Sequence, residues 1–231
     1  MNLEEAQKFL IGYGWLSKTE PYFRDAVIAR SHFKLVKPGE VLFLAGDEPR
    51  GLFGLAGGAV SASIAPDDSI PLIAHFFLPG SWFGEIPALT GRGYIVGLKA
   101  TRESFFLQLP MSSLRSILDA DPRGWRFLGL LAAEHTELSV GVVSDLMRRD
   151  SNQRFIALLM RMAGCRTDSK QNTPAAEVRV SQEDLAAISN LARTTVSSIL
   201  QGLEKTGLIE LRYRCIRVIN QEGLRELIDR S

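Results

Sequence analysis

Apolar residues between Val180 and Glu210 recur at three- and four-residue steps, a pattern typical of two short helices separated by a tight turn. Ser181 and, three residues later, Asp184 form a capping-box pattern that starts the first helix. Asn190 stands where the turn needs a left-handed backbone, which asparagine tolerates. The second helix is expected to bury Val196, Ile199, Leu200 and Leu203 and to expose Arg193, Thr194, Ser197 and Ser198.

This pattern predicts a helix-turn-helix, in which the exposed N-terminal end of the second helix reaches base edges in the major groove of DNA. An ordinary helical hairpin is the alternative. Residues 208–211 and 215–219 are strand-like runs that flank Arg212-Tyr213-Arg214. They predict a β-wing, with Arg212 and Arg214 contacting phosphates. Arginines also occur on solvated strand edges as a guard against aggregation, which is the alternative for this hairpin.

The first half of the chain has a different pattern. Residues 1–110 hold most of the 20 glycines and most of the 10 prolines, which break short apolar runs into turns. Strands are expected at residues 41–44, 60–64, 73–77 and 104–109. A mostly β region that closes into a compact barrel or jelly-roll follows, because closure removes exposed sheet edges.

A long helix is predicted from Asp121-Pro122, with the proline near its first position, to about Met147. Its apolar stripe lies either on the barrel as core or against a second copy as a coiled coil, and we favour pairing. Residues 148–150 are expected to form a hinge. Ser151 is then expected to cap a helix over residues 152–163, before an exposed loop at residues 166–176. The stripe comprises Leu128, Leu131, His135, Leu138, Val142 and Leu146.

Composition narrows the class of protein. A chain of 231 residues that is 45% hydrophobic can form two domains, and its net charge of +1 confines any affinity for nucleic acid to local clusters. Cys165 and Cys215 lack metal-ligand spacing and indicate a reduced cytoplasm rather than a disulfide scaffold. No apolar run approaches the ~18 residues of a membrane span. We therefore expect a cytoplasmic protein without a membrane partner.

The order of these parts resembles the catabolite-activator and fumarate-nitrate-regulator (Crp/Fnr) superfamily of bacterial transcription factors. The motifs that carry the resemblance occur in the family's order along nearly the whole chain. They are Pro38-Gly39-Glu40, Leu44-Ala45-Gly46-Asp47, Gly57-Gly58, the run from Pro79 to Glu85, and the helix-turn-helix from Val180 to Leu200.

The resemblance implies an α+β fold in three parts. A β-roll sensor domain of the cyclic-nucleotide-binding type would occupy residues 1–121, a long dimerisation helix with its hinge residues 122–150, and a winged helix-turn-helix domain residues 151–231. It also implies a homodimer on a palindromic operator, an RNA polymerase contact, and base reading by Arg193, Thr194 and Ser198. Thr194 replaces a glutamate common in the family, and Ser198 replaces an arginine of the catabolite activators, so the DNA site should differ.

The expected signal is an unidentified small molecule or none. Family members that bind cyclic AMP use a Gly-Glu pair, matched here by Gly84 and Glu85, and polar groups of the long helix, matched by Ser139. Their phosphate-binding Arg-Ser falls on residues 94–97, which carry no charge, and this disfavours a cyclic nucleotide. Two cysteines cannot hold an iron–sulfur cluster, and haem at His75 or His135 is disfavoured. The tentative ligand site is Gly84, Glu85, His135 and Ser139.

Two further classes were compared with the DNA-binding regulator. An enzyme of the cupin type needs closely spaced histidines, and His32, His75 and His135 lie far apart in the sequence. HExxH, Walker and GxSxG motifs are missing from the sequence, so we predict neither catalytic residues nor a metal site. A sensor subunit that acts through protein contacts is the third class, and salt-sensitive, selective DNA binding would separate it from the regulator.

Overall fold

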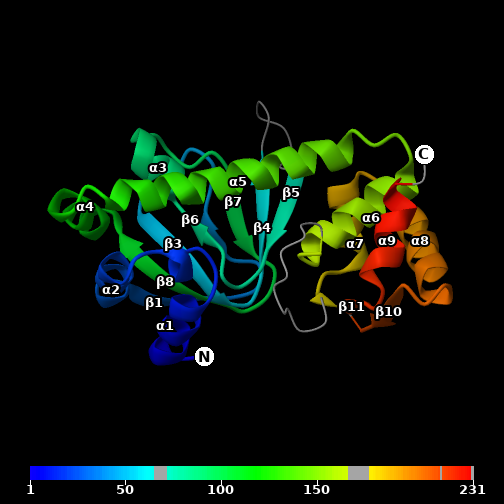
Figure 1. The fold of residues 1–231 in the computed structure, drawn as a ribbon, viewed down its shortest axis with the longest axis horizontal. Helices are drawn as coiled ribbons and strands as arrows, with labels where there is room; N and C mark the ends of the chain where they lie inside the picture. The colour runs from blue at the N-terminus through cyan, green and yellow to red at the C-terminus, as the bar shows by residue number, and fades with distance from the viewer. Residues whose placement is uncertain (65–71, 166–176, 214, 230–231) are drawn as a thin grey trace. The chain divides into compact units, whose positions relative to one another are not determined.

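The computed structural model describes residues 1–64, 72–165, 177–213 and 215–229 (Figure 1). The chain divides into two compact units, Met1–Glu137 and Leu138–Ser231. The division falls inside one long helix, α5 (Gly124–Leu146), which therefore contributes residues to both units. The expected loop at residues 166–176 lies outside the described residues. The hinge predicted at residues 148–150 stays a prediction.

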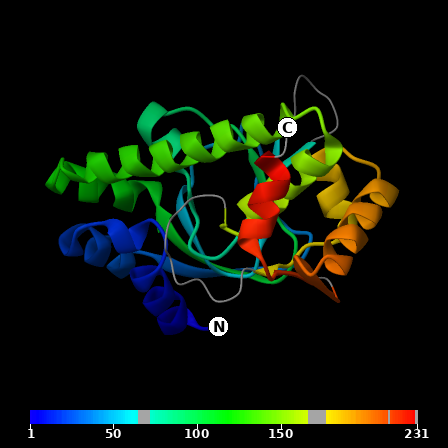
Figure 2. The same cartoon turned by 45° about the vertical axis from the view of Figure 1, so that its right-hand side comes forward.

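The N-terminal unit begins with helices that the glycine and proline pattern did not predict. They are α1 (Leu3–Gly12), the short 3-10 helix η1 (Leu16–Lys18) and α2 (Pro21–Ala29). Local signals for two of them are present: Asn2 and Glu5 form a capping box, and Pro21 is the first residue of α2. Of these helices (blue in Figure 2), α2 meets the start of α5, where the rings of Phe23 and Phe127 pack with centroids 5.0 Å apart.

Two four-stranded antiparallel sheets form the β-roll that the sequence predicts. Their strand orders are β1-β8-β3-β6 and β2-β7-β4-β5. The four predicted strands correspond to β2, β4, β5 and β8, while the other four were not predicted. The strands are β1 (His32–Val36), β2 (Val41–Phe43), β3 (Gly51–Gly57), β4 (Val60–Ile64), β5 (Leu72–Phe77), β6 (Trp82–Phe83), β7 (Gly97–Ala100) and β8 (Ser104–Pro110).

Strand β3 shows how the roll is packed, because its two faces enter two different cores. Leu52 and Ala56 join the core between the sheet and the helices, whereas Phe53 and Leu55 join the core between the two sheets. Gly54 has no side chain because a Cβ there would lie 2.6 Å from the Trp82 ring. Covering on both faces explains why β3 reads as a continuous apolar run rather than as an alternating one.

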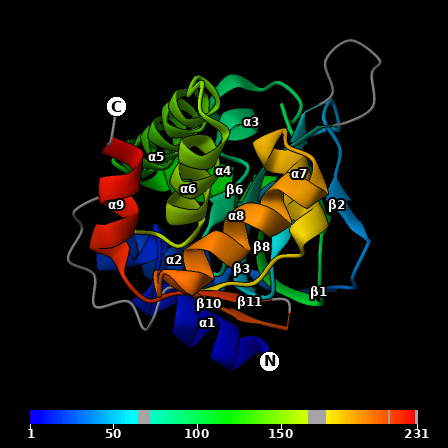
Figure 3. The same ribbon diagram turned by 90° about the vertical axis from the view of Figure 1, so that its right-hand side faces the viewer.

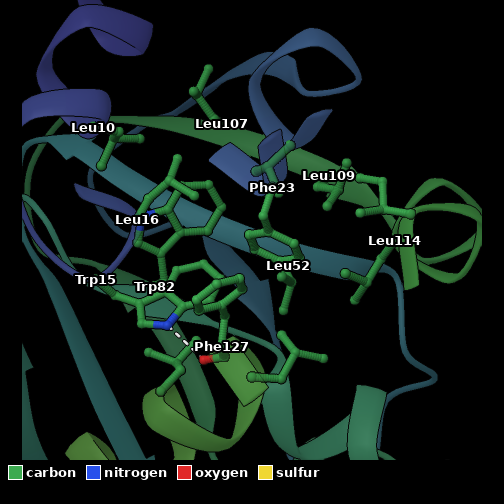
Figure 4. Close-up of a cluster of buried hydrophobic side chains, with 14 of the residues drawn as sticks. Leu10, Trp15, Leu16, Phe23, Leu52, Trp82, Leu107, Leu109, Leu114 and Phe127 are labelled. Carbon is green, nitrogen blue, oxygen red and sulfur yellow. Dashed lines mark hydrogen bonds between the residues drawn. The ribbon is translucent and has the colours of Figure 1, made fainter. Parts of the chain in front are cut away.

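The helix-facing core attaches the first half of α5 to the roll (Figure 4). Trp15 packs edge-on against Trp82 and donates its indole N–H to the carbonyl oxygen of Phe127, at 2.8 Å. Leu128 and Leu131 of α5 are fully buried in the same core. These two residues of the predicted pairing stripe are therefore core, and the preference for pairing was wrong for them. The spacing of apolar residues along α5 could not by itself show which face of the helix packs on the roll.

The remaining helices of this unit are α3 (Glu85–Thr90) and α4 (Met111–Ala120). The prediction that Pro122 is near the first position of α5 was also wrong, because the helix begins at Gly124. Pro122 instead lies in the preceding turn, where its carbonyl oxygen accepts the backbone N–H of Trp125. Asp121 closes this turn by accepting the backbone N–H of Arg123.

The C-terminal unit is helical with one small sheet (Figure 3). Asp150, rather than the predicted Ser151, caps its first helix, because the Asp150 carboxylate accepts the backbone N–H of Gln153. Helix α6 packs against α9, and α8 packs against β10. The elements are α6 (Ser151–Met162), β9 (Glu177–Val178), α7 (Gln182–Ser189), α8 (Arg193–Lys205), β10 (Ile209–Arg212), β11 (Cys215–Val218) and α9 (Gln221–Asp229).

A buried ion pair joins the end of α5 to α6 inside this unit. Arg161 donates its Nε–H to Asp145 at 2.8 Å, and the two side chains are only 9% and 2% exposed. Arg148 also donates to the carbonyl oxygen of Ile228, at 3.4 Å. Asp145 in the last turn of α5 is thus paired with α6, and Arg148, just beyond the helix, contacts the backbone of α9.

Candidate nucleic-acid interface and ligand site

The turn between α7 and α8 has the predicted geometry. Ser181 Oγ accepts the backbone N–H of Asp184 at 3.0 Å, and Asp184 accepts the N–H of Ser181 at 3.3 Å. Asn190 adopts the left-handed conformation with φ 53° and is the one described non-glycine residue with positive φ. The N–H of Leu191 then bonds the carbonyl oxygen of Ala186, which closes the end of α7. Local sequence alone sets this turn.

Helix α8 exposes most of the residues expected to meet DNA. Arg193, Thr194 and Ser198 are exposed, whereas Ser197 is half-buried. The expectation of an exposed Ser197 was wrong because it lies three residues before buried Leu200, at the border of the apolar stripe. The predicted apolar side chains are buried, namely Val196, Ile199, Leu200 and Leu203.

Two polar residues near this face were not predicted. Gln201 is exposed and lies seven residues after Thr194, so it shares the helix face of Thr194 and Ser198. Glu183 in the first turn of α7 lies 3.3 Å from the Arg193 guanidinium. Both side chains of this pair are largely exposed, so the pair contributes little stability. The signal for Gln201 was the same helical spacing that identified Ser198.

The wing has its two predicted strands and a third that the sequence did not reveal. Strand β9 adds Glu177 beside the wing, where its carboxylate lies 3.9 Å from the Arg212 guanidinium. The wing arginines therefore have two acidic neighbours, Glu177 and Glu210. Arg212 donates two hydrogen bonds to Glu210, at 2.9 and 3.1 Å, and this contact lowers the pKa of the Glu210 carboxyl. Tyr213 at the tip is 91% exposed. Arg214 lies outside the described residues, and its phosphate contact stays a prediction.

The predicted ligand residues of the N-terminal unit come together at the start of α3. Gly84 has a φ of 105°, and a Cβ there would collide with the carbonyl oxygen of Gly51, so the position requires glycine. Glu85 follows, with a side chain only 5% exposed. Its Oε1 lies 2.7 Å from Nδ1 of His135 on α5. A nitrogen that faces a carboxylate at this distance carries the proton, so Nδ1–H donates.

Aromatic rings surround this pair. The His135 imidazole stacks on Phe83, with centroids 6.2 Å apart and planes 16° apart, and meets Phe77 at 5.7 Å. His75 contacts the other side of Phe77 at 4.7 Å. Ser139, one turn further along α5, is exposed. The structure thus brings Glu85 and His135 into contact, while the assignment of Ser139 to a ligand stays a prediction.

The position expected to bind a phosphate, residues 94–97, begins in the core with Tyr94 and continues at the surface with Ile95. Tyr94 is buried, and its ring stacks on Phe43 with centroids 3.7 Å apart. Its hydroxyl accepts the backbone N–H of Arg50 at 3.0 Å, and burial raises the pKa of this phenol. Arg92, the nearest cation before it in the sequence, is exposed. A packed tyrosine therefore stands near the place where the family has a charged group.

Other chemistry is limited in the described part of the chain. Its acids, histidines and cysteines form no group of three that could hold a metal ion. Cys165 and Cys215 are both free thiols, and burial raises the pKa of each. None of the described helices combines the length and the apolar character that crossing a bilayer requires.

A β-roll followed by a long helix and a winged helix-turn-helix defines a two-part DNA-binding protein. Comparison with protein families agrees: residues 33–121 match the cyclic nucleotide-binding domain, and residues 153–227 match the Crp-like helix-turn-helix domain. The chain belongs to the Crp/Fnr superfamily and is a transcriptional regulator of that type.

Its similarity to individual relatives is low but extends over most of each chain. It is 21% identical to the cAMP-activated global transcriptional regulator Vfr of Pseudomonas aeruginosa, over 84% of this chain and 92% of that protein. It is 21% identical to the fumarate and nitrate reduction regulatory protein of Vibrio cholerae, over 92% and 84%. The structure of FixK2 from Bradyrhizobium japonicum matches with a TM-score of 0.73 at 20% identity, covering 87% of this chain and 98% of that one.

Proposed function

We propose that the chain works as a homodimer that binds a palindromic operator in double-stranded DNA. The observation that carries this proposal is the polar N-terminal face of α8, which the α7–α8 turn leaves exposed although an apolar core anchors the opposite face. Polar groups on a rigid helix next to a wing are suited to the major groove. Two copies related by a twofold axis would read two half-sites about one DNA turn apart.

The dimer seam is proposed on the exposed face of α5. Residues with heptad spacing on this face are all exposed, in contrast with Leu128 and Leu131. A heptad stripe on a helix lets two copies pair as a coiled coil. Glu137, the charged residue within this stripe, would fix the register of the two paired α5 helices, at a cost in stability. The stripe comprises Leu130, Ala133, Glu137, Val140, Ser144 and Met147.

Base reading is proposed for the exposed face of α8. Arg193 suits a bidentate contact with guanine O6 and N7, and the Thr194 methyl group suits a thymine methyl. Ser198 and Gln201 extend this face by one and two turns, and half-buried Ser197 lies at its border. The Thr194 hydroxyl can donate as well as accept, so it does not select cytosine N4 as an acceptor-only glutamate does, and the operator should lack the cytosine preference that a glutamate confers.

Phosphate contact is proposed for Arg212 and Arg214 of the wing. The Arg212 side chain is 47% exposed even while it is paired with Glu210, so it can exchange a carboxylate for a phosphate. Such contacts position the protein on DNA without selecting a sequence. Contact with RNA polymerase and action in the cytoplasm are further expectations from family membership.

The signal has two candidates. A small molecule bound at Gly84, Glu85, His135 and Ser139 would bias the α5 helices by preferring one of their arrangements. The relative Vfr is a cAMP-activated transcriptional regulator. The contact between Glu85 and His135 favours the second candidate, a regulator that binds DNA without a ligand. A sensor subunit that acts on proteins is opposed by the exposed polar face of α8.

The test is to select bound duplexes from fragmented genomic DNA with the purified full chain. We expect a palindromic motif, and we expect Arg193→Ala to lose about tenfold or more in specific affinity, since a bidentate guanine contact contributes about 1–3 kcal/mol. Lys205→Ala, at the other end of α8, is the matched control and should keep the motif. An unchanged motif in Arg193→Ala would mean that α8 is not the reading helix.

A further inference from the structure

A cyclic nucleotide does not fit the residues of this β-roll. The family's ligand needs a carboxylate for its sugar and a cation for its phosphate. Here the Glu85 carboxylate is buried and already bonded to His135, at 2.7 Å. At the phosphate position, residues 94–97 carry no charged side chain: Tyr94 packs on Phe43, and Ile95 is exposed. A phosphate at a position without a charged side chain lacks the charge-assisted contact that such a site normally supplies.

His135, which bonds the Glu85 carboxylate, lies on α5, the helix that a bound ligand would have to influence. His135 and Glu85 are 50 positions apart, and their contact joins α5 to α3. The flat imidazole also stacks on Phe83 and meets Phe77 edge to face, and these two rings contact each other at 4.8 Å. One side chain thus makes both the polar and the stacking contact. The start of α3 lies close to the backbone of Gly51, because Gly84 has no Cβ to collide with its carbonyl oxygen.

We propose that His135 takes the place of the effector, so that α5 is held against α3 by the protein's own side chain and DNA binding needs no cyclic nucleotide. His135 acts here as a positioning residue: through α5 it sets the placement of the helix-turn-helix that binds DNA. A ligand shifts an equilibrium only as far as it prefers one state, and an intramolecular partner supplies that preference permanently. This inference rests on the proposed DNA-binding function.

A second contact between α5 and the same unit provides the matched control. Lys18 donates to Glu134 at 2.9 Å, one residue before His135, but these side chains are 58% and 38% exposed. An exposed pair contributes little, whereas a buried carboxylate that loses its partner is costly. Glu134→Gln should therefore leave function unchanged, and changes at His135 should not.

The experiment measures the affinity of the full-length protein for its selected operator by fluorescence anisotropy, with and without cyclic AMP and cyclic GMP. We expect the wild-type protein to bind without either nucleotide, and its affinity to change by no more than about twofold when one is added. His135→Leu, which keeps an apolar body, should lose about tenfold in DNA affinity, within the usual range of coupling between sites. His135→Gln, which retains a donor, should recover most of that loss.

Circular dichroism and sedimentation of each variant separate this effect from misfolding or loss of the dimer. If His135→Leu does not fold, Glu85→Gln tests the same contact from the other side. Tighter binding by about tenfold in either nucleotide would overturn the proposal, and so would wild-type affinity in His135→Leu. Equal losses in His135→Leu and His135→Gln would overturn the hydrogen-bonding role. If no duplex is selected at all, the proposed DNA-binding function fails instead, whatever His135 does.

Discussion

The start of α3 and the N-terminal end of α8 differ in whether their polar side chains are buried or exposed. At the start of α3 the Glu85 carboxylate is buried and satisfied by His135, whereas the N-terminal end of α8 leaves Arg193 and Thr194 in solvent. A polar group satisfied inside the fold has little left to offer a partner, while an exposed one on a rigid helix does. The difference indicates that the C-terminal unit meets its partner directly and that the N-terminal site acts mainly on the fold.

The largest effect is expected from breaking the buried pair of the C-terminal unit, Asp145 and Arg161. Asp145→Ala leaves the Arg161 guanidinium buried without its carboxylate, and we expect a loss of about 3–5 kcal/mol in the free energy of unfolding. Trp15, Trp82 and Trp125 all lie in the N-terminal unit, so tryptophan fluorescence follows that unit alone, and circular dichroism follows both. In urea titrations, Asp145→Ala should shift the unfolding transition followed by dichroism and leave the transition followed by fluorescence unchanged.

Glu183→Ala is the control for Asp145→Ala, because it removes an exposed pair in the same unit. Its free energy of unfolding should change by no more than about 0.5 kcal/mol. A joint shift of fluorescence and dichroism in Asp145→Ala would show that the two units unfold together. In that case the buried pair would not be a feature of one unit alone.

A second prediction sharpens the specificity of α8. Thr194→Glu places an acceptor at the second residue of the helix, where the helix dipole also favours an acid. We expect a new preference for cytosine at one operator position, of about 1–3 kcal/mol, measured by repeating the duplex selection. Lys205→Gln changes the net charge by the same amount at the far end of α8 and should leave the motif unaltered. The same motif in both variants would contradict the assigned role of Thr194.

A smaller effect is expected in the wing. Arg212→Ala should weaken specific and non-specific duplexes alike, and it should reduce the slope of log affinity against log salt by about 0.9, the value for one phosphate contact. Arg115 on α4 is also exposed, so Arg115→Ala is the control in the other unit. A change of operator motif in Arg212→Ala would instead assign this arginine to a base.

The smallest effect concerns pH. The hydrogen bond from Arg212 lowers the pKa of Glu210, so this pair stabilises the folded unit above the ordinary pKa of the carboxyl. That contribution is lost as the pH falls through the lowered pKa. The melting temperature of Glu210→Gln should therefore lie slightly below that of the wild-type protein near pH 7, and the two should converge once the pH is below the lowered pKa of Glu210. A difference that persists in acid would show that Glu210 acts by packing.

Local sequence determined the reading unit. The Ser181–Asp184 capping box, the left-handed Asn190 and the apolar spacing of α8 all act between residues close in the chain, so the helix-turn-helix could be predicted in detail. The strands of the roll were predicted in part, where turn residues separate them. Strand β9 could not be predicted, because its two residues carry no pattern of their own and pair only with β11.

The tertiary structure alone decided which face of α5 is core. The helix is apolar on more than one side, so its period allows several stripes, and contact with the roll selects Leu128 and Leu131 for burial. It also decided that Glu85 meets His135, since no short-range rule joins residues so distant in the chain. Capping and turn preferences are local energies that a sequence displays directly. Burial and pairing depend on which surfaces meet, and that is settled only when the whole unit packs.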